Sequence, residues 1–390
     1  MVNILEVFWR FIILGCLSFG GPAAHIGYFQ TTFVERLQWL TQEKFAQLTA
    51  LSQFLPGPGS SQLGFAIGLQ KAGLAGGIAA FLGFTLPSFF IMISLALNLD
   101  HEQPNQLTQH VISSLKLVAV VVVADAIITM FKTFCMDKLT KLIMVLSAAS
   151  LILAPSILVQ TVTLICAALL GSAFADRSNL SSAKQGRPAE TTQINWPALI
   201  LFACLFVCLP VIAGASKNLN LFSDFYHAGS LVFGGGHVVL PLLQHTAGQD
   251  LSADQFLAGY AAAQAVPGPM FTLATYLGAS LSEPQWGGAI TATLAIFLPG
   301  FLLILAFQHS WGKLLTRPGF YGATFGVNAC VVGLLIAAFY QPVLTNAVSN
   351  WYDLIFCAAG LSALRLTKIP LIAIILAFLI HGVVIVPFLN

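Results

Sequence analysis

The two halves of this chain carry the same helix-breaking motifs in the same order. Each half has a Phe-Gly-Gly motif, then a Gln-x-x-Pro-Gly-Pro motif 31 to 34 residues later, and finally a Leu-Pro pair. The three copies are offset by 214, 211 and 212 residues, at 19–22 and 233–236, 53–58 and 264–269, and 86–87 and 298–299. The chain is therefore an internal duplication in which the interruptions between helices are copied together with the helices.

The composition is that of an integral membrane protein. Of 390 residues, 57% are hydrophobic and only 8% are charged, whereas a soluble domain has about 25% charged residues. Apolar runs such as 111–130 and 369–388 reach the roughly 20 residues that cross a bilayer as a helix, and they lack the alternation of a membrane barrel. The net charge of +2 includes no basic cluster for nucleic acid. Paired, interrupted hydrophobic segments in two halves are typical of secondary transporters.

The motifs interrupt apolar segments near their middle. The breaks at 20–22 and 56–59 leave arms of about 11 residues, each roughly 17 Å long and about half the hydrocarbon thickness. Proline removes a backbone donor and glycine loosens the chain, so we predict that each break is the tip of a re-entrant hairpin near mid-membrane. The second half offers the same pair at 234–236 and 267–269. A kinked but continuous helix is the alternative.

The other apolar runs predict ordinary spans, and a hydrophilic stretch separates the halves. The stretch 175–196 is rich in Ser, Gln, Lys, Arg and Thr, and the run 197–213 has no partner in the repeat. The predicted spans are about 74–97, 110–131, 142–154, 157–174, 197–213, 287–309, 320–340, 351–364 and 369–387.

Loop charges indicate that the repeats are inverted. Loop 98–109 carries two acids and no Lys or Arg, whereas its counterpart 310–319 carries Lys313 and Arg317 and no acid. Similar contrasts occur between loops 132–141 and 341–350, between the turns at Pro155 and 365–368, and between the segments around 36–44 and 250–254. Lys217 is the exception. By the positive-inside rule, each loop and its copy lie on opposite sides of the membrane. We predict a first transmembrane repeat at 1–174, a cytoplasmic linker at 175–196, a linking helix at 197–213 and an inverted second repeat at 214–390.

These motifs also form an ordered set that resembles a known family. Residues 19–22 with His25, 55–59, 233–237, 266–269 and both Leu-Pro pairs make the chain similar to full-length, two-domain members of the chromate ion transporter family (the CHR superfamily). The resemblance covers nearly the whole chain and implies chromate export, with sulfate as the look-alike ion. Gly236 stands where the first half has Pro22, so the two tips need not behave alike.

Helix N-termini at the breaks are suited to a tetrahedral oxyanion. Their free N–H groups and partial positive charge supply donors without a full cation that would hold the ion too tightly. We expect four N-termini to converge, after Gly21, Gly59, Gly236 and Pro269, with the hydroxyls of Ser60, Ser61 and Thr272 in their first turns. The predicted substrate-binding residues are Gly20, Gly21, His25, Gly57, Gly59, Ser60, Ser61, Lys116, Gly235, Gly236, His237, Gly268 and Thr272. The alternative for the glycines and prolines is helix packing and kinking.

Several polar residues in apolar surroundings have two possible roles. Lys116 either balances part of a dianion's charge, or snorkels to the surface or pairs with an acid. His25 and His237 donate to the anion, carry protons or make structural hydrogen bonds. Gln53 and Gln264 donate to the ion or satisfy backbone groups freed by proline, and Asp125 carries protons or caps a polar contact. The structural or coupling candidates are Gln53, Gln264, Pro56, Pro58, Pro267, Pro269 and Asp125.

No enzyme or cofactor motif occurs in the sequence. It has no P-loop and no His-Glu-x-x-His or Cys/His metal set, so we expect no cofactor, no metal and no catalytic residue. Energy must then come from the membrane potential or a coupled ion. We predict a multi-pass carrier of the cell (inner or plasma) membrane that exports chromate, with the lipid bilayer and a possible second copy as partners. The competing hypotheses are a carrier or exchanger of sulfate or another oxyanion, and an anion channel.

Overall fold

The structure, a computed structural model, describes residues 4–19, 21–98, 106–174, 194–233, 239–246, 251–310, 318–367 and 369–385. These residues form helices joined by short turns, and no strand occurs among them. Within the ranges just given, five helices are long and apolar enough to cross a membrane: Gly59–Asn98, Gln109–Phe134, Trp196–Ala215, Gln285–Phe307 and Gly322–Ala347. The predicted all-α polytopic membrane fold is confirmed.

Each predicted span falls on a helix. The main helices are α1 (Ile4–Leu17), α2 (Gly21–Phe29), α3 (Gln42–Phe54), α4 (Gly59–Asn98), α5 (Gln106–Phe134), α6 (Lys138–Leu153), α7 (Ile157–Phe174), α9 (Trp196–Ile212), α10 (Lys217–Leu231), α11 (Val239–Thr246), α12 (Ala253–Ala265), α13 (Leu273–Leu281), α14 (Gln285–Phe307), α16 (Pro318–Ala338), α18 (Trp351–Leu366) and α19 (Leu371–Ile380). Short turns of other helix types extend several of them, among them η5 (Met270–Thr272), which leads into α13.

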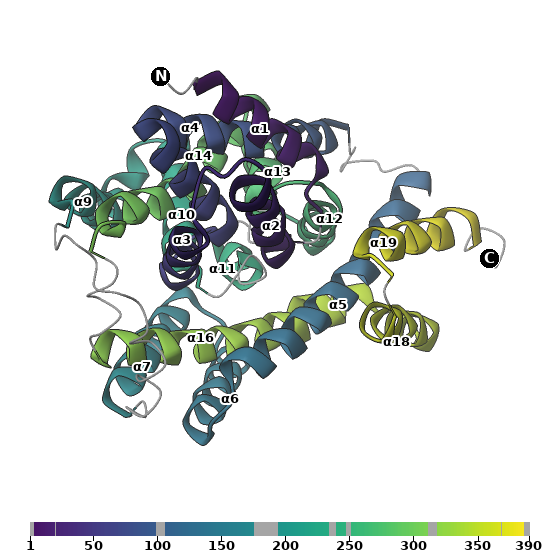
Figure 1. Cartoon of the computed structure of the whole chain (residues 1–390). Coiled ribbons are helices and arrows are strands. Elements are labelled where there is room, and N and C mark those ends of the chain that lie inside the picture. Colours follow the sequence, from purple (N-terminus) through teal and green to yellow (C-terminus); the bar gives the residue numbers. More distant parts are fainter. Residues whose placement is uncertain are drawn as a thin grey trace.

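The helices form two groups, which Figure 1 shows one above the other. The first, which we call the tip bundle, contains α1–α4 and α9–α14; the second, the arm bundle, contains α5–α7 and α16–α19. The two bundles meet mainly where α5 packs on α12, with smaller contacts of α11 with α16 and of α12 with α19. Each bundle thus combines helices from residues 1–174 with helices from residues 214–390.

Exposed apolar side chains cover the outside of this structure. On α9, the side chains of Ile200, Val207 and Val211 are exposed, and α6 and α7 carry similar faces that include Leu146 and Leu169. Such surface is unfavourable in water and is suited to lipid, which supports a protein embedded in the bilayer.

Three of the four predicted breaks lie between helices that the structure describes. α1 ends at Leu17 and α2 begins at Gly21, while α3 ends at Phe54 and α4 begins at Gly59. In the second half, α12 ends at Ala265 before η5 begins at Met270, and the break at 234–236 lies outside the described residues. Re-entrance of the arms stays a prediction.

α4 folds back on itself, and its two arms touch at a pair of glycines. The backbone leaves helical geometry at Ala72 and Gly73, and the two arms touch where a Cβ on Gly68 would lie 2.3 Å from the carbonyl oxygen of Gly76. In the second half, a Cβ on Gly278 would lie 2.4 Å from the carbonyl oxygen of Gly288. Only glycine permits so close a contact of two helix backbones, and both halves use it at the same place in their order of helices.

Gly68→Ala and Gly278→Ala should therefore each destabilise the protein. The added methyl group must push two backbones apart, which costs about 1–3 kcal/mol and should lower the melting temperature of the purified protein in detergent. The control is Gly214→Ala, because a Cβ there would meet nothing within 4 Å. Equal melting temperatures for all three variants would contradict this account of the hairpins.

Candidate functional site

Two backbone hydrogen bonds bring the breaks of the two halves together. The N–H of Gly57, in the first Pro-Gly-Pro motif, donates to the carbonyl of Val232 at the end of α10 over 2.7 Å. The N–H of Gly268, in the second motif, donates to the carbonyl of Ser18 at the end of α1 over 2.9 Å. Each Pro-Gly-Pro tip thus bonds to the broken helix of the opposite half, and the breaks meet inside the tip bundle.

Both tips require glycine. Gly57 has a φ of +127° and Gly268 has a φ of +96°, values that side-chain-bearing residues rarely adopt. A Cβ on Gly57 would lie 3.0 Å from Cα of Gly300, and one on Gly268 would lie 3.2 Å from the Phe84 carbonyl oxygen. The glycines are therefore explained by backbone geometry and close packing.

Gln62 holds the first tip in place. Its side chain is fully buried, and its Nε2 donates to the carbonyls of Pro56 over 2.9 Å and of Gly300 over 3.2 Å. This is one of the two roles predicted for Gln53, whose side chain is instead exposed. Gln264 contacts Met270 and Tyr260. The sequence feature that could have identified Gln62 is a single glutamine within an apolar arm, because a buried amide needs hydrogen-bond partners.

The prolines that flank the tips differ in burial. Pro58 and Pro269 are buried, while Pro56 and Pro267 are half-buried. The carbonyls of Pro56, Pro58 and Pro269 all accept hydrogen bonds, from Gln62 Nε2, from the Gln62 N–H and from the Thr272 N–H respectively. The proline carbonyls thus help to fix the turn that leads into the next helix.

The N-terminus of α4 begins directly at the first tip. Gly59 is its first residue, and the side chains of Ser60 and Ser61 in its first turn are buried. The Ser61 hydroxyl has no hydrogen-bond partner among the described residues. At the matching place in the second half, the Thr272 hydroxyl donates to the carbonyl of Pro269 over 2.8 Å. The Ser61 hydroxyl therefore lacks a hydrogen-bond partner among the described residues, whereas the Thr272 hydroxyl already has one.

His25 lies on α2, close to the end of α1. Its side chain is 1% exposed and packs edge-on against Phe84, with ring centroids 5.2 Å apart. The backbone of Ser18 is near the ring, yet neither ring nitrogen reaches hydrogen-bond geometry with any described group. Gly21 begins α2 with a φ of +77°. The predicted site residues Gly20, Gly235, Gly236 and His237 lie outside the described residues.

Two ion pairs engage the predicted charged residues. Lys116 Nζ lies 2.8 Å from Asp254 Oδ1, and Arg365 Nη1 lies 2.7 Å from Asp125 Oδ1. The Lys116–Asp254 pair joins α5 to α12, and the Arg365–Asp125 pair joins α18 to α5. Of the alternatives for these residues, pairing of Lys116 with an acid and a polar contact for Asp125 are the arrangements observed. Within the described part of the chain, no group of three or more His, Cys, Asp and Glu side chains is placed to hold a metal ion.

We expect Gln62→Leu to destabilise the protein and Gln53→Leu to leave its stability unchanged. The first substitution leaves the Pro56 and Gly300 carbonyls without their side-chain donor, a loss of about 1–3 kcal/mol for a buried group. The second removes only an exposed amide. Thermal unfolding of the two purified variants, followed by tryptophan fluorescence, compares them. A melting temperature of Gln62→Leu at or above that of Gln53→Leu would show that Gln62 does not hold the tip.

Comparison with known proteins places the chain in a family. The chromate transporter family matches residues 5–172 and 219–383. The chain is 26% identical, over 98% of its length, to a chromate transport protein of Pseudomonas aeruginosa, of which it covers 92%. It is 28% identical, over 96% of its length, to a probable chromate transport protein of Synechococcus elongatus, covering 93% of it. It is also 26% identical, over 97% of its length, to an uncharacterized transporter of Methanocaldococcus jannaschii, covering 93%. No solved structure matches the chain. The family match spans most of both halves, and the chain belongs to the chromate transporter family.

Proposed function

We propose that this protein exports chromate across the cell membrane and binds the ion where the tips of the two halves cross. Membership of the chromate transporter family supports chromate transport as the general activity. The observation that carries the proposed site is the start of α4, where a buried helix N-terminus and the unpartnered Ser61 hydroxyl lie beside the Gly57 tip. The first N–H groups of a helix have no acceptor within that helix, and they favour an anion.

The charges around the tips support moderate binding. Lys116, the lysine predicted to balance the charge of the anion, is already paired with Asp254, so it is not free to neutralise a dianion. Hydroxyl and backbone N–H donors then provide the hydrogen bonds. Binding by neutral donors favours release on the far side of the membrane, because a carrier must let its ion go.

The membrane potential can drive export without another coupled ion. Moving two negative charges out of a cell across 100 mV, inside negative, releases roughly 4.6 kcal/mol. That is more than a thousandfold in concentration ratio. A proton-coupled cycle is compatible with the same site.

The two bundles offer the moving parts of a transport cycle. In an inverted-repeat carrier, one group of helices rocks against another around a central site. The tips lie in the tip bundle, and its principal contact with the arm bundle runs from α12 to α5. We propose that this contact changes during transport, with the linker 175–196 on the cytoplasmic side of the inner or plasma membrane. Sulfate, which has the same shape and charge as chromate, is the competing substrate.

The test is flux in liposomes that contain the purified protein. Under an imposed potential, chromate flux should saturate, respond to the sign of the potential and fall when sulfate is added. Ser61→Ala should lower the apparent affinity for chromate about tenfold, the effect of losing one hydrogen bond to a charged ligand.

Three other outcomes would change this proposal. Flux that does not saturate would favour an anion channel. Flux of sulfate with none of chromate would favour a sulfate carrier on the same site. If neither anion moves under any potential or pH gradient, the proposed function is wrong.

The Lys116–Asp254 pair permits a separate test of the bundle contact. Lys116→Asp places two carboxylates side by side and should slow transport severalfold. The added substitution Asp254→Lys restores the pair with reversed charges and should recover most of the rate. The pair is partly exposed, 14% for Lys116 and 53% for Asp254, so changes in stability should stay within about 1 kcal/mol. If Lys116 instead contacts the anion, the charge swap will not restore transport.

A further inference from the structure

Buried polar side chains without partners gather at the breaks of the first half. They are the hydroxyls of Ser18, Ser61 and Thr85, the Oε1 atom of Gln62 and both ring nitrogens of His25, none of which is hydrogen-bonded to a described group. Ser18 and His25 are 0% and 1% exposed, and Thr85 is 3% exposed. Burying a polar group without a hydrogen bond is unfavourable, so these groups are suited to a ligand or to water that a ligand displaces.

Ser18 contacts the Gly268 tip directly, while Thr85 belongs to the α4 turn that the tip touches and His25 packs against that turn. The Ser18 carbonyl accepts the hydrogen bond from Gly268 N–H. On its other side, Gly268 faces the turn of α4 that contains Thr85, since a Cβ on Gly268 would lie 3.2 Å from the Phe84 carbonyl oxygen and 3.0 Å from Ser88 Oγ. His25 packs against Phe84 in the same turn.

The first turn of α4 lies at the same level of the bundle. Phe11 of α1 contacts both Gly64 and Gly83, because a Cβ on either glycine would touch its side chain. The two arms of α4 therefore run side by side here. Ser61 lies one turn before Gly64, so its position along the bundle is close to that of Phe84 and of the residues around Gly268.

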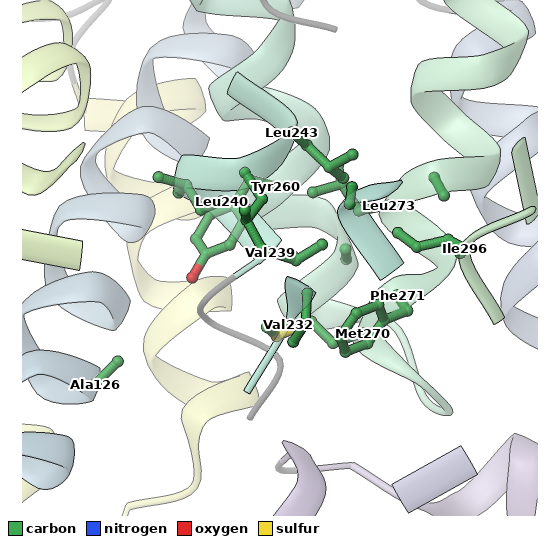
Figure 2. Packing of buried hydrophobic residues seen from close by; sticks show 14 of the residues in the cluster. Ala126, Val232, Val239, Leu240, Leu243, Tyr260, Met270, Phe271, Leu273 and Ile296 are labelled. Atoms are coloured by element: carbon green, nitrogen blue, oxygen red, sulfur yellow. The ribbon is translucent and has the colours of Figure 1, made fainter. Parts of the chain in front are cut away.

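The matching positions of the second half are apolar or already satisfied. The offsets of the repeat pair Ser18 with Val232, His25 with Val239 and Thr85 with Phe297, and all three side chains of the second half are fully buried. Figure 2 shows Val232 and Val239 in one hydrophobic cluster with Met270 and Phe271. The counterpart of Ser61 is Thr272, whose hydroxyl donates to Pro269.

We infer that the chain binds one oxyanion, at the first-half break, through the hydroxyls of Ser18, Ser61 and Thr85 and the His25 ring. This inference rests on the proposed function and names the half of the protein that provides the side-chain donors. O–H and N–H groups are the donors that a tetrahedral dianion requires. The second half contributes the Gly268 tip and an apolar wall, so the backbone scaffold is duplicated but the binding chemistry is not.

The experiment measures equilibrium binding of radiolabelled chromate to the purified full-length protein, with sulfate as competitor. Thr85→Val replaces the hydroxyl by a methyl group of similar volume, and Ser18→Val does the same while adding a second methyl group. Each should weaken binding about tenfold, as expected for one hydrogen bond to a charged ligand. At saturation, the wild-type protein should bind one anion per chain.

Two controls separate binding from folding. Ser18→Thr keeps a hydroxyl and should retain most of the affinity. The second control is Ser230→Ala, at a buried second-half residue two positions before Val232. The Ser230 hydroxyl donates to the Tyr226 carbonyl over 2.7 Å, and its removal should leave the affinity unchanged. Melting temperatures of all variants identify any that fail to fold, and Thr85→Ser then provides a second test of that position.

Several results would overturn the inference. Two equivalent anions per chain would show a symmetric pair of sites. Unchanged affinity in folded Ser18→Val and Thr85→Val, with normal binding by the wild type, would show that these groups are structural, while the proposed function stands. A wild-type protein that binds neither chromate nor sulfate would contradict the proposed function itself.

Discussion

The centre of this protein depends on two reciprocal backbone hydrogen bonds, from Gly57 to Val232 and from Gly268 to Ser18. Each joins a Pro-Gly-Pro tip of one half to the end of a broken helix of the other half. In an apolar interior, a peptide group left without a partner is costly, so every helix interruption must find its acceptor or donor elsewhere. Here the interruptions satisfy one another across the repeat. The positive φ angles of the two glycines and the contact of Gly57 with Gly300 follow from this arrangement.

Because the tips cross between the halves, neither repeat forms a separate body. The tip bundle takes α1–α4 from the first repeat, their counterparts α10–α14 from the second and the linking helix α9, and the arm bundle takes α5–α7 and α16–α19 (Figure 1). α5 connects the two bundles and carries both observed ion pairs, at Lys116 and Asp125. These residues are nine positions apart, or roughly 13 Å along the helix. One pair joins α5 to the tip bundle, whereas the other joins it to α18 within its own bundle, so a motion between bundles would break only the first.

A duplicated scaffold does not require duplicated chemistry. Glycine contacts such as Gly68 with Gly76 and Gly278 with Gly288 are the same in both halves, because the same helix crossings require them. The polar side chains are not the same, because Ser18 and His25 of the first half correspond to Val232 and Val239 of the second. Backbone packing constrains the helix crossings within each half, while a single ion bound at the first-half break needs side-chain donors from only one of the halves. This difference is the physical basis of the one-site inference.

Local sequence patterns were enough to predict where helices break, which segments are long and apolar enough to cross a membrane, and which family the chain resembles, because glycine, proline and long apolar runs act locally. They also made Ser61 a site candidate, and its hydroxyl is buried without a hydrogen-bond partner among the described residues. Packing in three dimensions was needed to show which glutamine holds a tip, since Gln62 is selected by the Gly300 carbonyl, 238 residues away. The same is true of the pairing of Lys116 with Asp254, and of the contacts of Gly268 with Ser18 and with Phe84 and Ser88 of α4. These choices depend on contacts between residues more than a hundred positions apart, which composition and periodicity do not encode.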